Sequence, residues 1–333
     1  MSRKPVPAQA GDRSRIEVLF DRPQLLGALF GQYDQHLVVV ENRLGVYIAA
    51  RGNRLQIEGE ATAAARARDV LTSLYNRIVQ GHEIDAGAVD ATIAMSAEPV
   101  LDGIIRHDND LAGGIMIRTR KKTILPRSPT QTRYMEALTR HDIIFALGPA
   151  GTGKTYLAVA QAVAQLITGS VQRLILSRPA VEAGEKIGFL PGDMKEKVDP
   201  YLRPLYDALY DCLPAEQVER RIASGEIEIA PIAFMRGRTL ADSFIILDEA
   251  QNTTPAQMKM FLTRFGQNSR MVVCGDPNQT DLPKGQESGL NDGVGKLEGV
   301  EGIGMVRFGI GDVVRHPVVG RIVEAYEGPT QGA

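Results

Sequence analysis

GPAGTGKT, residues 148–155, directly follows the apolar run 143–147 and precedes a long stretch typical of a helix. It satisfies the pattern G-x-x-x-x-G-K-[ST] of a phosphate-binding loop, in which glycines let backbone N–H groups turn toward phosphates. A helix that begins near Lys154 points the positive end of its dipole at the same anion. We therefore expect the loop to hold a nucleotide; the alternative is a glycine-rich structural turn. The expected phosphate-binding residues are Gly148, Pro149, Ala150, Gly151, Thr152, Gly153, Lys154 and Thr155.

Two of these residues have expected roles beyond the loop backbone. Lys154 is expected to reach the β- and γ-phosphates, and the hydroxyl of Thr155 is expected to hold Mg²⁺. Hydrolases and kinases share such a loop, so the reaction type has to come from a second motif.

Two carboxylates end an apolar run in the stretch FIILDEAQNTT, residues 244–254. They follow a buried strand, at the edge where ligands of open α/β sheets bind. Asp248 is expected to bind Mg²⁺, directly or through water, as the acidic partner of Thr155. Glu249 is expected to orient and deprotonate a water molecule, which favours hydrolysis over phosphoryl transfer to a metabolite. The alternative is a pair of exposed strand-end carboxylates without a role.

A second strand-end loop follows in MVVCGDPNQTDLP, residues 271–283. Gln279 in this loop is expected to lie near the γ-phosphate and to sense whether it is present. The alternative is a polar turn, because Asp-Pro and Asn favour turns. Between the two motifs, Thr254-Pro-Ala-Gln257 matches a capping box with proline at the first helical position, which predicts a helix from 255 to about 265.

Short apolar segments alternate with helical stretches from about residue 126 onward. This alternation predicts an α/β fold with a mostly parallel sheet covered by helices on both faces. The fold class is therefore expected to be that of a P-loop NTPase. The expected strands are 143–147, 174–176, 227–229, 244–247, 271–274 and 305–308.

The N-terminal part is expected to be a small α+β domain, with the order strand, helix, helix, strand, strand, helix over 15–81. This order is similar to a KH module, which clamps single-stranded nucleic acid with a GxxG loop between its first two helices. Here that loop reads Gly31-Gln32-Tyr33-Asp34. A carboxylate repels phosphate, so phosphate clamping is not expected at this loop. The alternative is a small packing or oligomerisation domain.

A basic segment lies ahead of the phosphate-loop domain, where residues 111–135 contain six arginines and lysines before the next acidic residue. A solvated linker and a nucleic-acid contact through Arg118, Arg120 and Lys121 are both open interpretations. The expected division of the chain is a tail (1–14), the KH-like domain (15–82), a linker with the basic segment (83–125), the P-loop ATPase domain (126–327) and a second tail (328–333).

Composition limits the classes of protein that need considering. The net charge of −2 excludes a chain that coats nucleic acid by being basic throughout. Two cysteines without a CxxC pair indicate a reducing compartment and no cysteine-based metal site. No secretory signal and no apolar run of ~20 residues is present. We expect a cytoplasmic protein that does not associate with membranes.

The motifs GPAGTGKT, DEAQ and GDPNQ, in this order, resemble those of the PhoH family, whose ATPase core is similar to that of superfamily 1 helicases. The resemblance covers roughly residues 126–327, and the KH-like module fits the bacterial two-domain branch of the family. It implies a RecA-like core that uses ATP with Mg²⁺. It also places Gln131 where helicase-like ATPases carry a glutamine that recognises adenine.

The resemblance implies roles for several arginines as well. Arg178 resembles a residue on the nucleic-acid side of such cores, and Arg236 and Arg238 are expected to contact a phosphate backbone. Arg315 is expected to stabilise charge in the transition state, in its own or a neighbouring subunit. For each of them a surface salt bridge is the alternative.

The leading hypothesis is an ATP-hydrolysing protein that binds single-stranded RNA and works beside a YbeY-type endoribonuclease in RNA or ribosome maturation. The chain has residues for only one RecA-like lobe, which implies a homo-oligomeric ring, and the family suggests a hexamer. An ATPase that remodels a protein partner without RNA contact is the second hypothesis. Stimulation by RNA and salt-dependent binding distinguish the two. A small-molecule kinase is disfavoured by Glu249.

Overall fold

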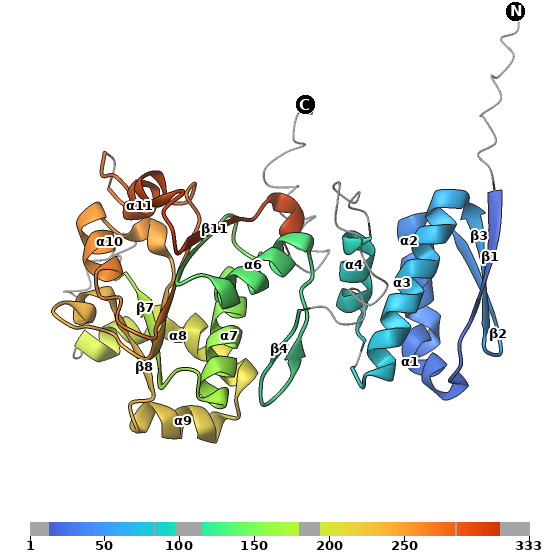
Figure 1. Cartoon of the computed structure of the whole chain (residues 1–333), viewed down its shortest axis with the longest axis horizontal. Helices are drawn as coiled ribbons and strands as arrows, with labels where there is room; N and C mark the ends of the chain where they lie inside the picture. Colours follow the sequence, from blue (N-terminus) through green and yellow to red (C-terminus); the bar gives the residue numbers. More distant parts are fainter. Residues whose placement is uncertain (1–12, 83, 97–114, 180–193, 284, 314–333) are drawn as a thin grey trace, which may run out of the picture. The chain divides into compact units, whose positions relative to one another are not determined.

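The computed structural model describes residues 13–82, 84–96, 115–179, 194–283 and 285–313 (Figure 1). These residues form two compact units, each with its own hydrophobic core. The first unit holds the described residues up to Ile115 together with Leu125–Pro129. The second holds Met116–Ile124 and the described residues from Thr130 onward.

The first unit is a three-stranded antiparallel sheet packed against helices (Figure 1). The strand order is β1-β3-β2, so the last strand along the chain lies in the middle, and Ile57 of β3 pairs with Ile16 and Ile48 on its two sides. The predicted order of elements is confirmed. The elements are β1 (Arg13–Leu19), α1 (Leu26–Phe30), α2 (Gln35–Leu44), β2 (Tyr47–Arg51), β3 (Arg54–Glu60), α3 (Ala61–Val79) and α4 (Ala86–Met95).

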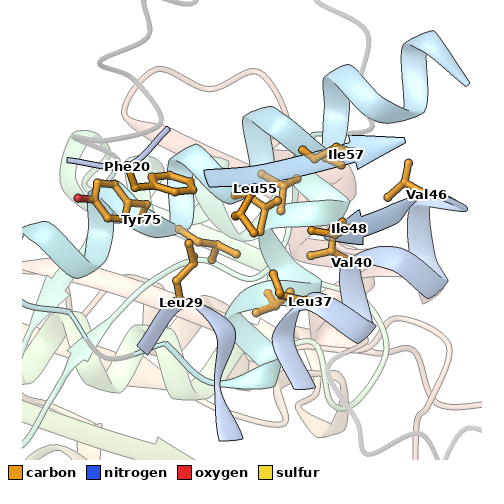
Figure 2. Packing of buried hydrophobic residues seen from close by; sticks show 14 of the residues in the cluster. Phe20, Leu29, Leu37, Val40, Val46, Ile48, Leu55, Ile57 and Tyr75 are labelled. Atoms are coloured by element: carbon orange, nitrogen blue, oxygen red, sulfur yellow. The ribbon is translucent and has the colours of Figure 1, made fainter. Parts of the chain in front are cut away.

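The core of this unit lies between the sheet and its helices (Figure 2). Leu55 and Ile57 alternate along β3 with exposed or half-buried residues and are fully shielded from solvent. Leu29 and Val40 bring α1 and α2 onto the same face, as period-2 and helical spacing require. The hydrophobic pattern therefore fixes which face of the sheet is covered.

The loop between α1 and α2 differs from a GxxG loop in conformation as well as in sequence. Tyr33 and Asp34 have φ values of 53° and 58°, a region that residues with a Cβ seldom adopt. Tyr33 is 99% exposed. The loop thus presents an aromatic ring and a carboxylate where a KH domain presents glycine backbone.

The basic segment forms a short hairpin, β4 (Ile117–Arg118) with β5 (Thr123–Ile124), that belongs to the second unit. Nζ of Lys122 pairs with the carboxylate of Asp211, and Nζ of Lys121 donates to the carbonyl oxygen of Tyr210 at 2.8 Å. The region expected as a linker, 83–125, therefore contains helix α4 and this hairpin in its described part. Lys121, expected as a nucleic-acid contact, is engaged within the chain.

The second unit is built on a six-stranded sheet in the order β11-β6-β10-β9-β7-β8, in which every neighbouring pair is parallel. The predicted α/β class and all six predicted strands are confirmed. The elements are α6 (Pro129–Arg140), β6 (Ile143–Leu147), α7 (Lys154–Thr168), β7 (Arg173–Arg178), α8 (Met194–Cys212), α9 (Ala215–Ala223), β8 (Ile227–Pro231), η4 (Ile232–Met235), β9 (Ser243–Leu247), η5 (Ala250–Asn252), α10 (Pro255–Leu262), β10 (Arg270–Gly275), α11 (Gly289–Leu297), β11 (Ile303–Arg307) and η6 (Ile310–Asp312).

Burial on both faces explains why the central strands are continuously apolar. Ile144 and Phe145 are adjacent in β6 and point to opposite faces, yet both are fully buried. The capping box at the start of α10 is confirmed, with Thr254 and Gln257 each bonding the other's backbone N–H. The helix ends at Leu262, three residues before the predicted boundary.

Strand order determines which loops meet. β10 lies between β6 and β9, and β7 lies on the other side of β9. The carboxyl ends of parallel strands share one edge, so the loops after β6, β9, β10 and β7 gather there although long segments of chain separate them. All three sequence motifs follow strands of this group.

Candidate active site at the phosphate loop

The loop between β6 and α7 has the backbone that a phosphate cradle requires. Gly148, Gly151 and Gly153 have φ values of 136°, 84° and 85°, which residues with a Cβ rarely adopt. A Cβ at Gly148 would also lie 2.4 Å from the carbonyl oxygen of Phe308. Helix α7 begins at Lys154, so the N–H groups of its first turn face the loop. The glycines of the motif are thus required by the geometry.

The ammonium group of Lys154 is folded onto its own loop. Nζ donates to the carbonyl oxygens of Gly148 at 2.6 Å and Pro149 at 2.8 Å. Lys154 is only 8% exposed, and burial lowers the pKa of its ammonium group, while the charges of nearby carboxylates act in the opposite direction. A buried cation is stabilised by an anionic partner, and the phosphate chain of a nucleotide is one.

Two side chains of α6 pack against the loop. Gln131 is 4% exposed, and its Nε2 donates to the carbonyl oxygen of Thr152 at 2.9 Å. Tyr134 donates its hydroxyl to the carbonyl oxygen of Lys154 at 3.1 Å, and burial raises the pKa of this hydroxyl, so it stays a donor. The structure therefore places Gln131 on the loop backbone. It is not among the described residues that line the cavity.

Thr155 and Asp248 meet although 93 positions separate them. Oγ1 of Thr155 donates to Oδ1 of Asp248 at 2.5 Å. The other oxygen, Oδ2, accepts from Nε of Arg178 at 2.8 Å and from its NH2 group. The Asp248 side chain is only 6% exposed, so these partners offset the cost of burying its charge. A hydroxyl beside a carboxylate fits Mg²⁺, which takes one or two protein oxygens and completes its coordination with phosphates and water.

Glu249 is held in a strained backbone conformation. Its φ and ψ are 53° and 40°, in the left-handed region that costs a residue with a Cβ about 1–3 kcal/mol. Oε2 accepts from Nε2 of Gln251 at 2.6 Å, and Oε1 lies 3.7 Å from the NH2 group of Arg178. The side chain is 48% exposed. Glu249 is thus oriented by an amide while remaining accessible to water.

Gln251, which has no predicted role, joins the loops that follow β9 and β10. Besides bonding Glu249, Gln251 accepts a hydrogen bond at Oε1 from the backbone N–H of Asp276 at 3.1 Å. The next residue, Asn252, exchanges two hydrogen bonds with Asp281, at 3.1 Å and 2.8 Å. Two amides one residue after two strand-end carboxylates were the signal that could have identified this link.

These groups line a cavity of about 780 Å³, which is within the usual range for a small-molecule site. Gln279 lies in the lining, in the loop after β10 where its motif places it. The described lining residues are Ala150, Gly151, Gly153, Lys154, Thr155, Tyr156, Arg178, Pro204, Asp207, Ala208, Tyr210, Asp211, Asp248, Glu249, Gln251, Gly275, Asp276 and Gln279.

Comparison with known proteins accounts for this arrangement. The family model described as "PhoH-like protein" matches residues 123–327. The chain belongs to the PhoH family. A PhoH-like protein of Bacillus subtilis is 49% identical over 300 residues, which cover 90% of this chain and 93% of that protein. A PhoH-like protein of Synechocystis is 47% identical over 92% of each chain, and Protein PhoH of Escherichia coli is 48% identical over 61% of this chain and 58% of its own.

Membership in the PhoH family makes the chain a P-loop NTPase, as the site geometry indicates. The family predicted from the motifs GPAGTGKT, DEAQ and GDPNQ is therefore confirmed. Among the described residues, no helix is both long and apolar enough to cross a bilayer.

The structure separates the arginines that the PhoH resemblance groups together. Arg178 lines the nucleotide cavity, with a side chain 16% exposed, instead of lying on an outer nucleic-acid surface. Arg238 donates to both carboxylate oxygens of Glu228, at 2.6 Å and 2.7 Å, and so is already paired. Arg236 is exposed at the end of η4. Arg315 lies outside the described residues.

In this PhoH-family chain, Tyr156 lines the cavity and contacts Lys122 of the β4–β5 hairpin. Tyr156, the residue after Thr155, lines the cavity and lies under Nζ of Lys122, 5.5 Å from the ring centre. Burial raises the pKa of Tyr156 to about 12. Arg118 and Arg120 are exposed on the hairpin that carries Lys122. Tyr156 gave no signal in the sequence beyond its place after the motif.

Proposed function

We propose that this chain hydrolyses ATP with Mg²⁺ and couples the cycle to binding single-stranded RNA in RNA or ribosome maturation. The observation that carries the proposal is the contact between Thr155 and Asp248, with Glu249 beside it in the same cavity. A phosphate loop alone supports binding. A phosphate loop whose hydroxyl meets a strand-end acid, followed by a second, accessible acid, supports hydrolysis.

Hydrolysis requires a base near the terminal phosphate. Glu249 would accept the proton of the attacking water, and Gln251 holds its carboxylate in place through Oε2. Lys154 would exchange the carbonyl oxygens of its own loop for phosphate oxygens, a stronger, charge-assisted interaction. Gln279, in the lining on the loop after β10, would respond to the γ-phosphate.

Thr155 and Asp248 would hold Mg²⁺. When bound, the ion would neutralise charge on the β- and γ-phosphates. The two protein oxygens are already 2.5 Å apart, so the site needs little rearrangement to supply both.

RNA binding is supported by exposed groups on the surface of the second unit. Phe234 is 56% exposed and lies two residues from the exposed Arg236. An aromatic ring beside an arginine can stack a base and contact the adjacent phosphate. Arg118 and Arg120 on the β4–β5 hairpin are further candidates for phosphate contacts. These contacts are independent of sequence, which suits a protein that processes varied RNA.

The PhoH resemblance supplies the rest of the proposal. It suggests a closed ring of identical subunits, with six as the number, in which Arg315 acts at a subunit boundary. It also suggests a YbeY-type endoribonuclease as a partner, and recognition of adenine through Gln131. The cytoplasm is the proposed compartment, and the two cysteines, Cys212 and Cys274, are buried free thiols.

The test is phosphate release from ATP by the purified chain with Mg²⁺, with and without short single-stranded RNA, alongside native mass. Lys154→Ala is the control, because loss of the phosphate-binding cation should abolish turnover. We expect RNA to stimulate release and RNA affinity to fall steeply with salt. Hydrolysis that RNA does not affect would favour the alternative, an ATPase that remodels a protein partner. Absence of phosphate release under all conditions would overturn the proposal.

A further inference from the structure

Arg178 occupies the cavity at the carboxyl end of β7. Its guanidinium contacts the acids of the DEAQ motif, with Nε 2.8 Å from Oδ2 of Asp248 and NH2 3.7 Å from Oε1 of Glu249. NH1 donates to the carbonyl oxygen of Tyr201 in α8 at 2.8 Å. The side chain is 16% exposed. The guanidinium is therefore fixed beside the groups that would bind metal and activate water.

The two oxygens of Asp248 are divided between different partners. Oδ1 accepts from the hydroxyl of Thr155, and Oδ2 accepts from Arg178. Mg²⁺ is expected beside Thr155, at the Oδ1 oxygen of Asp248. Arg178 consequently lies on the side of Asp248 that faces Glu249, where the terminal phosphate and its attacking water would be.

We propose that Arg178 is a catalytic residue that contacts the γ-phosphate from within the same chain and stabilises the charge of the transition state. This inference rests on the proposed ATP hydrolysis. It replaces the expected role of Arg178 in nucleic-acid binding and does not depend on Arg315.

Electrostatics favours a change of partner for the Arg178 guanidinium, from Asp248 to the γ-phosphate. Asp248 shares its negative charge once it ligates Mg²⁺, and the γ-phosphate then becomes the stronger anion within reach of Arg178. An arginine presents five N–H donors in a planar fork that suits phosphate oxygens. The bond from NH1 to the carbonyl oxygen of Tyr201 can persist while Nε and NH2 change partners, so the side chain need not leave the cavity.

The step that Arg178 would assist is an in-line displacement. The water oxygen forms a bond to the γ-phosphorus, and the bond from that phosphorus to the β–γ bridging oxygen breaks. The electron pair of the broken bond leaves with ADP, and Glu249 takes the proton from the water. Arg178 would donate to γ-phosphate oxygens as their charge redistributes, a contribution worth about 10³-fold or more in rate for arginines in this role.

The experiment compares the full chain with Arg178→Ala, Arg178→Lys and the control Arg173→Ala. Arg173 lies at the opposite end of the same strand, where it donates to the carbonyl oxygen of Ala241. The measurements are kcat, equilibrium dissociation constants for a non-hydrolysable ATP analogue and for ADP, RNA affinity and thermal melting. Arg178→Lys keeps a charge against the buried Asp248, so it remains informative if Arg178→Ala is unstable.

We expect Arg178→Ala to lower kcat about 10³-fold. It should weaken binding of the ATP analogue by about tenfold or more, because a charge-assisted bond is lost. The affinities for ADP and RNA should be unchanged. Arg178→Lys should recover part of kcat, and Arg173→Ala should match the wild type. An equal loss of affinity for the ATP analogue and for ADP would show that Arg178 only supports Asp248, and would overturn the proposal. So would unchanged kcat, or lost RNA affinity with normal ATP binding. A wild type that binds both nucleotides but hydrolyses none would overturn the proposed function and this role together.

Discussion

Gln251 orients Glu249: its Nε2 donates to Oε2 of the carboxylate at 2.6 Å. The same side chain accepts the backbone N–H of Asp276 at 3.1 Å and is 3% exposed. Glu249, the proposed general base after β9, is thereby tied to the loop after β10 that carries Gln279. If the loop after β10 senses the γ-phosphate as proposed, Gln251 alone would connect it to Glu249.

Replacing Gln251 should impair turnover more than binding. Gln251→Ala removes both hydrogen bonds and frees the carboxylate, so kcat should fall about 10²-fold with little change in KM, as misorientation of a catalytic group predicts. Gln251→Glu places a second negative charge against Glu249, which raises the pKa of a carboxylate. The acid limb of the kcat profile should therefore move to higher pH in Gln251→Glu. A pH profile identical to the wild type would contradict the positioning role.

Glu249→Gln should separate binding from hydrolysis. The amide is isosteric and cannot accept the proton, so kcat should fall by about 10²- to 10⁴-fold, while a fluorescent ATP analogue binds as before. Glu216→Gln, on the exposed face of α9, is the control. Loss of nucleotide affinity in Glu249→Gln alone would assign this carboxylate a structural role.

Arg236 and Arg238 should give different phenotypes. Arg236→Ala should weaken RNA binding and reduce its dependence on salt by about one phosphate contact, without affecting stability. Arg238→Ala should leave RNA affinity unchanged and lower the free energy of unfolding by about 0.5–1 kcal/mol, as for a partly exposed ion pair. Filter binding at several salt concentrations and denaturant titration measure the two effects. A loss of RNA affinity in Arg238→Ala would contradict this division.

The stability effect of Arg238 should also depend on pH. Hydrogen bonding from Arg238 lowers the pKa of Glu228. The pair therefore contributes above the usual carboxyl range and is lost as the pH falls through the lowered pKa. The difference in unfolding free energy between wild type and Arg238→Ala should be constant near neutral pH and should shrink in acid.

Both thiols should resist modification in the folded protein. Burial raises the pKa of Cys274 to about 12 and that of Cys212 to about 11, so at pH 8 the reactive thiolate is scarce in addition to being shielded. Labelling with a maleimide should be slow in buffer and complete in denaturant. ATP should slow it further by stabilising the folded state. Rapid labelling of the native protein would show that β10 or the end of α8 opens.

Gly148→Ala should destabilise the phosphate loop. The new Cβ would meet the carbonyl oxygen of Phe308 at 2.4 Å, at a φ of 136°, so the loop must shift and ATP affinity should fall. Gly295→Ala, inside α11 with nothing within 4 Å, is the matched control. It should be neutral or stabilising by up to ~1 kcal/mol, since alanine favours helix. Equal behaviour of the two variants in melting and ATP binding would contradict the geometry.

Local patterns were sufficient for much of the fold. The glycines of the phosphate loop, the capping box at Thr254 and the apolar strands all depend on residues close in sequence, and the structure contains each of them. Asp248 and Glu249 could be placed as well, because residues at the end of a buried parallel strand reach a known edge of the sheet.

The side chains that each arginine contacts could not be predicted in the same way. Arg178, Arg236 and Arg238 are alike in sequence, yet one lies in the cavity, one is exposed and one is paired with Glu228. The difference arises because β7, which ends in Arg178, lies next to β9. Glu228 lies in β8, and Arg238 comes just after η4, which follows that strand. A charge pattern along the chain carries no information about such neighbours.

The sequence by itself determined the elements, the motifs and the class of chemistry, since these depend on spacing over a few residues. Only the tertiary structure decided that Gln251 bridges two strand ends and that Arg178 faces Asp248. The physical reason is strand order: side chains far apart in the chain meet only after the sheet has brought their strands side by side.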